Sequence, residues 1–248
     1  MTKPSEVPLV LIHGVGLDHT MWLPTTSALA HRRTVAYDVI GHGRARKPPG
    51  PYTLAMFVAQ LSEIVNALGG DIDLVGFSMG ALVAQGYALS AGPDRLRRMV
   101  LLNTVHDRSA EEREAILDRV AQARAGRFEA SVEPALQRWF TPTFVAARPD
   151  AVAAVRGLLL DNDARSYADA YEVFATADAE LARRTAEIIT PTLVVTGGDD
   201  RRSTPAMTTS LATALPNASS VILPRLRHLT PIEAPDLVAK LIDEFTRP

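Results

Sequence analysis

The sequence predicts an α/β fold in which helices join the strands of a mostly parallel sheet. Short apolar runs alternate with longer helical patterns along the chain, and this alternation is typical of strand–helix–strand units. Several runs lack polar alternation, as expected for strands buried on both faces. The 248 residues and 47% hydrophobic content suit a sizeable core. The expected strands, about six in number, are residues 9–13, 34–38, 72–78, 99–105, 192–197 and 220–223.

Helices are expected in the gaps between these runs and after the last one. Thr53 is a suitable N-cap for a helix that stops at the Gly69-Gly70 pair. The segment 79–90 is small and apolar on all sides, so it should form a buried helix. Proline near the start of each segment favours surface helices over residues 204–215 and 235–245.

Residues 106–189 interrupt the alternation because they contain no convincing strand, and a stretch of this length is no plain loop. Helical patterns around 110–125, 129–139, 150–160 and 165–177 predict a helical cap, inserted after the fourth run over one end of the sheet. Residues 1–105 and 190–248 would then form the core. The cap carries 11 Arg against 15 Asp plus Glu, which disfavours a polyanionic substrate but leaves room for one arginine to bind a carboxylate.

Composition excludes several classes of function. The chain has 26 Lys plus Arg and 28 Asp plus Glu, a net charge of −2, which argues against binding nucleic acid or an anionic membrane. Cysteine is absent, so disulfides, thiolate catalysis and Cys-ligated zinc are excluded. The first apolar run is too short for a signal peptide, and no window reaches the ~18 apolar residues of a membrane span. We therefore expect a cytoplasmic protein with a small-molecule substrate; its oligomeric state is not indicated.

The strongest motif is Gly76-Phe77-Ser78-Met79-Gly80, between a strand-like run and a helix-like run. In such an elbow the serine sits on a strained turn, and the flanking glycines let the helix pack closely. Ser78 is the expected nucleophile, and Met79 would offer its backbone N–H to an oxyanion. A second donor is expected from the glycine-rich loop after the first strand, where Val15 is the candidate. In that loop, His13 more plausibly braces the backbone than reacts.

A serine nucleophile needs a base, and the base needs an orienting acid. His228 is the expected base because it follows the last strand-like run, whereas His42 lies in a tight glycine-rich turn where bracing is the simpler role. Three carboxylates compete for the acid. Asp199 and Asp200 end the fifth run, and Asp107 follows the fourth; each could instead cap a helix or turn.

The chain resembles the α/β-hydrolase superfamily, and within it small bacterial enol-lactonases, carboxylesterases and meta-cleavage-product hydrolases with a helical cap. The matching motifs run nearly from end to end: HGVG, YDVIGHGRARKP, GFSMG, GGDDRRSTP and RHLTPIEAP. The resemblance implies a three-layer α/β-hydrolase fold with the chain order nucleophile, acid, histidine. In the family the acid lies three residues after the glycine that ends its strand, which implies Asp200 rather than Asp199.

The chain also departs from this family pattern. Arg227 stands where a glycine commonly precedes the histidine, which places a cation beside the site, and Ala45 replaces a serine in the GHGxS turn. Only six residues precede the first apolar stretch, which begins at Val7, so the usual leading hairpin is expected to be missing, which is consistent with about six strands.

The motifs together predict a serine hydrolase that cleaves an ester, lactone or related activated carbonyl through an acyl-enzyme. No metal or organic cofactor is required. Alternatives are a C–C bond hydrolase of the meta-cleavage-product type, a cofactor-free perhydrolase or haloperoxidase, and a receptor-like relative without turnover. The possible pocket linings, each equally able to be plain core, are Leu17, Trp22, Met79, Trp139, Phe140 and Phe144.

Overall fold

The computed structural model describes residues 7–90 and 95–247, and these residues form one six-stranded sheet in which every neighbouring pair of strands is parallel. The spatial order is β2-β1-β3-β4-β5-β6. The strands are β1 (Leu9–Ile12), β2 (Thr34–Tyr37), β3 (Ile72–Phe77), β4 (Leu96–Leu102), β5 (Thr192–Gly197) and β6 (Ala218–Leu223). The α/β class and the number of strands are therefore confirmed. The expectation of a missing leading hairpin concerns residues 1–6, which lie outside the described ranges.

Burial explains why the apolar runs lack alternation. Every residue of β1, β3 and β5 is buried, whereas β6, at one edge of the sheet, is largely exposed or half-buried. Only β5 has both expected ends among the described strands; β1, β2 and β3 each end one residue earlier, β6 begins at Ala218, and β4 is displaced by three residues. β4 ends at Leu102 and not at residue 105, because Asn103 takes a positive φ of 49° that a strand cannot continue.

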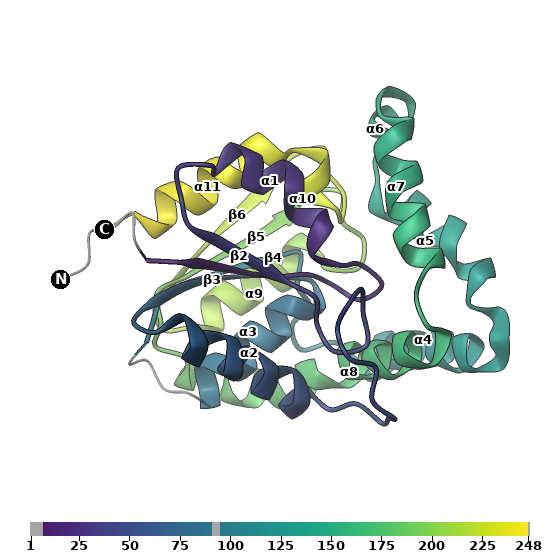
Figure 1. Cartoon of the computed structure of the whole chain (residues 1–248), viewed down its shortest axis with the longest axis horizontal. Coiled ribbons are helices and arrows are strands. Elements are labelled where there is room, and N and C mark those ends of the chain that lie inside the picture. The colour runs from purple at the N-terminus through teal and green to yellow at the C-terminus, as the bar shows by residue number, and fades with distance from the viewer. Residues whose placement is uncertain (1–6, 91–94, 248) are drawn as a thin grey trace.

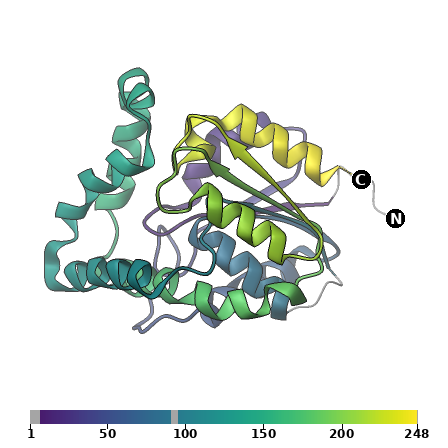
Figure 2. The same ribbon diagram turned by 180° about the vertical axis from the view of Figure 1, so that it is seen from behind.

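Helices cover both faces of the sheet (Figures 1 and 2). The helices α1 (Leu23–Ala28) and α11 (Pro235–Thr246) lie on one face, and α2 (Leu54–Leu68), α3 (Met79–Ser90) and α9 (Pro205–Ala214) lie on the other. As predicted, α2 begins directly after Thr53 and ends before Gly69, although the Thr53 side chain makes no capping hydrogen bond. None of the helices in the described ranges is long and apolar enough to cross a membrane.

Between β4 and β5 the chain forms helices and no strand. They are α4 (Ala110–Gln122), η3 (Ala123–Arg127), η4 (Glu129–Ser131), α5 (Val132–Trp139), α6 (Pro142–Ala147), α7 (Pro149–Leu160), α8 (Ala164–Arg184) and η5 (Thr185–Glu187). In Figures 1 and 2, α5, α6 and α7 stand to one side of the sheet, and α4 and α8 connect them to it. Below, residues 106–189 are called the cap. α8 is longer than the helix expected over residues 165–177, because its buried face continues as far as Leu181.

Candidate active site

The motifs from separate parts of the sequence meet at the carboxyl edge of the sheet, where all loops after parallel strands converge. A cavity of about 380 Å³ lies there between the core and the cap. Its wall includes Ser78 after β3, Asp200 after β5 and His228 after β6, together with Val15 after β1. The sheet order thus brings together residues that are far apart in the sequence.

Ser78 occupies the turn between β3 and α3 with a φ of 54°, in the left-handed region that a non-glycine residue seldom adopts. Its backbone N–H donates to the carbonyl of Leu102 at 2.8 Å, which fixes the turn to β4. A Cβ at Gly76 would clash with the backbone of Gly80, and one at Gly80 would clash with the carbonyl of Ile12. Both glycines are therefore required for the helix to start so close to the strands.

His228 and Asp200 form a buried pair. Nδ1 of His228 lies 2.7 Å from Oδ2 of Asp200, and the other carboxylate oxygen accepts the backbone N–H groups of Arg202 at 3.0 Å and Ser203 at 3.1 Å. Burial by itself would raise the pKa of Asp200, but the charge and hydrogen bond of His228, together with these further donors, hold that pKa below its ordinary value. Asp200 is therefore ionised and accepts hydrogen bonds on both oxygens.

Neither of the other two candidate acids, Asp199 and Asp107, contacts His228 in the part of the chain that the structure describes. Asp199 is exposed, although it is adjacent to Asp200 and also borders the cavity. Asp107 is exposed and has a positive φ of 47°. Within residues 7–90 and 95–247, Asp200 is the carboxylate that contacts His228. This geometry agrees with the choice that the resemblance implied.

Asn103 is a site residue that the sequence reasoning missed. Its amide nitrogen lies 3.1 Å from Oδ2 of Asp200 and 3.3 Å from the carbonyl oxygen of Arg227. Its Oδ1 accepts the hydroxyl of Thr230 at 2.5 Å. Asn103 therefore hydrogen-bonds to the candidate acid and to residues on both sides of His228 in the sequence. Its sequence signal was a polar amide inside the apolar run 99–105, a residue type that tolerates the left-handed turn found here.

The loop after β1 borders the cavity, and two of its backbone N–H groups are already bonded within the protein. The N–H of Gly16 donates to Nε2 of His42 at 2.9 Å, and the N–H of Leu17 to the carbonyl of Gly14 at 3.3 Å. No acceptor among the described residues takes the N–H of Val15, which borders the cavity. Met79 begins α3, where N–H groups lack partners within the helix. This arrangement is consistent with the two donors expected from the sequence.

The side chains of His13 and His42 hold this loop in place through hydrogen bonds to the backbone, as the sequence suggested. The N–H of Val39 donates to Nε2 of His13 at 3.0 Å, so Nδ1 of His13 carries the proton and donates to the Gly14 carbonyl at 2.8 Å. His42 likewise accepts from Gly16 and donates to the Ile40 carbonyl at 3.2 Å. Burial lowers the pKa of His13 to about 4 and that of His42 to about 3. Both side chains are therefore neutral in the folded protein.

We expect this bracing to make the fold acid-sensitive. In the unfolded chain both histidines take up protons near pH ~6.5, whereas the folded chain resists protonation down to about pH 4. The free energy of unfolding should therefore fall as pH drops from ~6.5 to ~4, by about 1.4 kcal/mol per pH unit for each histidine. Urea unfolding at a series of pH values measures this slope. His42→Gln, which keeps an acceptor for Gly16, should show a shallower slope; an unchanged slope would contradict the assignment.

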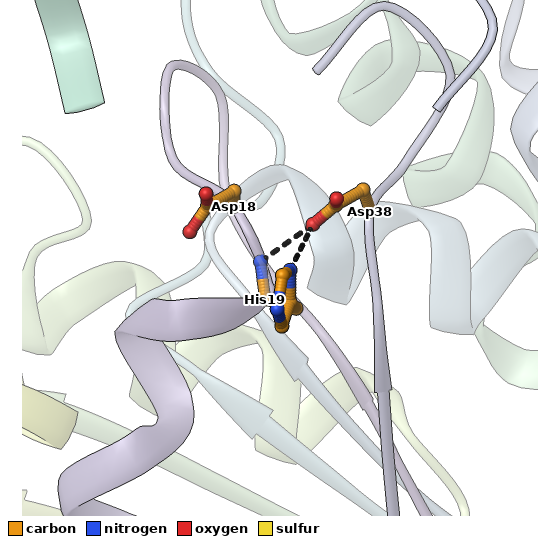
Figure 3. A group of neighbouring side chains, drawn as sticks. All are labelled: Asp18, His19 and Asp38. Carbon is orange, nitrogen blue, oxygen red and sulfur yellow. Dashed lines mark hydrogen bonds and ion pairs between the residues drawn. The ribbon is translucent and has the colours of Figure 1, made fainter. Parts of the chain in front are cut away.

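Figure 3 shows a further brace of the same loop, in which His19 contacts Asp38 through both its backbone N–H, at 2.8 Å, and its ring Nδ1, at 2.6 Å. Asp18 lies beside them, and one ligand atom from each of the three residues falls within 4.8 Å of the others. Their acceptors are already used: Asp38 also accepts the N–H of Arg44 at 2.9 Å, and Asp18 that of Thr20 at 2.9 Å. We therefore interpret the cluster as an internal link between the β1 and β2 loops.

Arg227, the departure from the family pattern, joins the His228 loop to the cap. Its guanidinium donates to the carbonyls of Gln137 at 2.5 Å and Phe140 at 2.9 Å. Its backbone N–H donates to Glu233, whose other carboxylate oxygen accepts the N–H and the hydroxyl of Thr141, both at 2.7 Å. The cation expected beside the site therefore has a structural use: it holds the end of α5 against the loop that carries the base.

Only part of the expected apolar lining borders the cavity. Leu17 and Trp139 line its wall, and the ring centroid of Trp139 is 6.0 Å from that of His228. The expectation is wrong for Met79, whose side chain is fully buried and does not border the cavity. It is also wrong for the aromatic residues Trp22, Phe140 and Phe144, which do not border the cavity. Trp22 and Phe140 are fully buried; Trp22 packs edge-on against Phe77, and Phe140 stacks on Phe144. These side chains are core, because burial against other rings removes them from the cleft.

Comparison with known proteins shows which family this chain belongs to. A family model described as the alpha/beta hydrolase family matches residues 9–241. A protein of Acinetobacter baylyi named (E)-2-((N-methylformamido)methylene)succinate hydrolase is 33% identical over 235 residues, covering 93% of this chain and 87% of that protein. The 3-oxoadipate enol-lactonase 2 of the same organism is 26% identical over 229 residues, covering 92% and 84%.

A solved structure is similar over nearly the whole chain. The crystal structure of the enol-lactonase from Burkholderia xenovorans superposes with a TM-score of 0.89 at 31% identity, covering 96% of this chain and 90% of that one. Its similarity spans the sheet and the inserted helices alike. With a family model that matches most of its length and relatives that are hydrolases, the chain belongs to the alpha/beta hydrolase family and is a hydrolase.

Proposed function

We propose that the protein is a serine hydrolase that cleaves a carboxylic ester, lactone or related activated carbonyl through an acyl-enzyme. The observation that carries this proposal is the 2.7 Å contact between His228 Nδ1 and Asp200, at a cavity that Ser78 also lines. A histidine that donates from Nδ1 keeps Nε2 as a proton acceptor. The relatives named as an enol-lactonase and as a succinate-derivative hydrolase support hydrolysis of an activated carbonyl.

In the proposed mechanism, Ser78 Oγ attacks the carbonyl carbon while His228 removes its proton. The N–H groups of Val15 and Met79 stabilise the resulting oxyanion, a contribution of about 10²–10³ in rate for each such donor. His228 then protonates the leaving alkoxide, and water, activated by the same histidine, releases the acid from Ser78. Asp200 keeps the imidazole in the required tautomer and stabilises its charged form.

A fluorophosphonate probe tests the nucleophile directly. Intact-mass spectrometry should show a single adduct, and peptide mapping should place it on Ser78. Ser131→Ala is a matched control on the same cavity wall, because the Ser131 hydroxyl is engaged with the Phe128 carbonyl at 2.6 Å and should not react. Labelling at another residue, or none in a preparation that hydrolyses esters, would contradict the proposal.

Substrate comparison separates the proposal from its alternatives. A neutral para-nitrophenyl ester should be turned over faster than a vinylogous diketone of similar size. Faster cleavage of the diketone would favour the C–C bond hydrolase. Labelling of Ser78 without turnover of either compound would favour a receptor-like protein.

A further inference from the structure

The catalytic cavity is rich in arginine, although the cap as a whole is acidic. Three carboxylates line it, of which Asp200 is bound by His228 and Glu112 accepts the N–H of Ser109 at 2.9 Å. Six arginines line it: Arg108, Arg119, Arg138, Arg201, Arg202 and Arg227. The average charge of the cap disfavoured a polyanionic substrate and left room for one arginine to bind a carboxylate, but that average is a poor guide to the charge at the site.

Two of these arginines are committed to structural contacts. Arg108 is buried and pairs with Asp178 at 2.6 Å, and Arg227 donates to cap carbonyls as described above. The others are not neutralised by the protein. Among the described residues, Arg119 hydrogen-bonds only a neutral partner, the hydroxyl of Tyr171 at 3.0 Å, and the guanidinium of Arg138 has no hydrogen-bond or ion-pair partner. By contrast, carboxylates within 4 Å neutralise the cap arginines Arg124, Arg148, Arg156 and Arg184.

The uncommitted arginines converge from three different segments. Arg119 comes from α4, Arg138 from α5, and Arg201 and Arg202 from the loop after β5, where the backbone N–H of Arg202 also donates to Asp200. Arg119 and Arg202 are the two whose positive charges act on Arg138. Partial burial lowers the pKa of Arg138, and the positive charges of Arg119 and Arg202 lower it further, whereas Tyr171 opposes this. Like charges held together beside a cavity repel one another, and a bound anion would relieve that repulsion.

We propose that Arg119, Arg138 and Arg202 form a carboxylate-binding subsite of the catalytic cavity, so that the substrate is a small ester or lactone with a free carboxylate remote from the scissile carbonyl. The inference rests on the proposed function, because it concerns the substrate of the same site. A guanidinium matches a carboxylate with two parallel hydrogen bonds, which fixes orientation as well as affinity. A cavity of about 380 Å³ suits a small organic acid rather than a long acyl chain.

A matched pair of substrates tests the subsite: mono(para-nitrophenyl) glutarate and its methyl ester, which share the leaving group and the acyl chain and differ in one negative charge. We expect kcat/KM to be about 10- to 100-fold higher for the acid, mostly through a lower KM. Arg138→Gln should abolish this preference, because it should lower kcat/KM for the acid much more than kcat/KM for the neutral ester. Arg138→Lys should keep part of the preference, because it retains the charge without the bidentate geometry.

Arg156→Gln is the matched control, since Arg156 is a cap arginine that pairs with Glu133 away from the cavity, and the preference should persist in it. A binding measurement keeps the inference independent of turnover: glutarate should raise the Tm of the parent and of Arg156→Gln, but not that of Arg138→Gln. Equal kcat/KM for the two esters, or equal Tm shifts in the parent and Arg138→Gln, would overturn the subsite. A glutarate shift specific to Arg138 without ester hydrolysis or probe labelling would retain the subsite and reject the proposed function.

Discussion

Replacing Ser78 with alanine is expected to lower kcat by about 10⁴- to 10⁶-fold, because the attacking oxygen is lost while the rest of the site remains. The Ser78→Ala protein should fold normally. The backbone at residue 78 has a φ of 54°, and serine and alanine carry the same Cβ strain there. Steady-state hydrolysis of a para-nitrophenyl ester measures the loss, and thermal unfolding checks the fold.

The residual activity of Ser78→Ala is informative as well. The Val15 and Met79 N–H groups remain in place, so water attack on a bound ester should still exceed the uncatalysed rate, by about 10³–10⁴ if the site behaves like other serine hydrolases. Ser131→Ala, the same substitution on the same cavity wall, should retain kcat within about threefold. A loss of less than tenfold in Ser78→Ala would remove Ser78 from the nucleophile's role.

Replacing Asp200 with asparagine is expected to lower kcat by up to about 10⁴-fold. The asparagine amide cannot accept the Nδ1–H of His228 as an anion does, so the productive tautomer loses its 2.7 Å partner. Asn103 makes the loss more severe, since its amide nitrogen also donates to Asp200 Oδ2 at 3.1 Å and would face a second donor in one orientation of the new side chain.

The same substitution at the competing acids provides the control. Asp107 and Asp199 are both exposed, and their replacement by asparagine removes one charge without disturbing a buried contact. Both variants should stay within about tenfold of the parent. Parallel kinetics on the three variants decide the question: a large loss confined to Asp107→Asn would place the acid after β4 and refute the assignment of Asp200.

Several features of this protein follow from local sequence alone. The elbow at Ser78 needs glycine at both flanking positions because the backbone of α3 approaches β1 and β3 too closely for a Cβ, and that requirement is visible as a five-residue pattern. The parallel sheet is likewise visible, because strands covered by helices on both faces have continuous apolar runs. His13 and His42 were recognisable as braces from their positions in glycine-rich turns next to strand ends.

Other features depend on which distant segments of the chain come into contact, and a local sequence pattern does not contain that information. Asp199, Asp200 and Asp107 have the same chemistry; only the fold selects Asp200, by burying it against His228 and Asn103. The expected lining residues were all apolar, yet Trp22 and Phe140 pack into the core, and arginines of α4 and α5 line the cavity.

The sequence by itself determined the sheet, the elbow and the order of the catalytic motifs, since each depends on backbone conformation and burial within a few neighbouring residues. The tertiary structure alone decided which carboxylate faces the histidine and which charges face the cavity. Coulomb interactions and hydrogen bonds act over a few ångströms in space, whereas Arg119 and Arg202 lie on separate segments until the cap docks beside β5. The net charge of the cap is an average over all of its residues, whereas a bound substrate interacts only with the side chains that line the cavity.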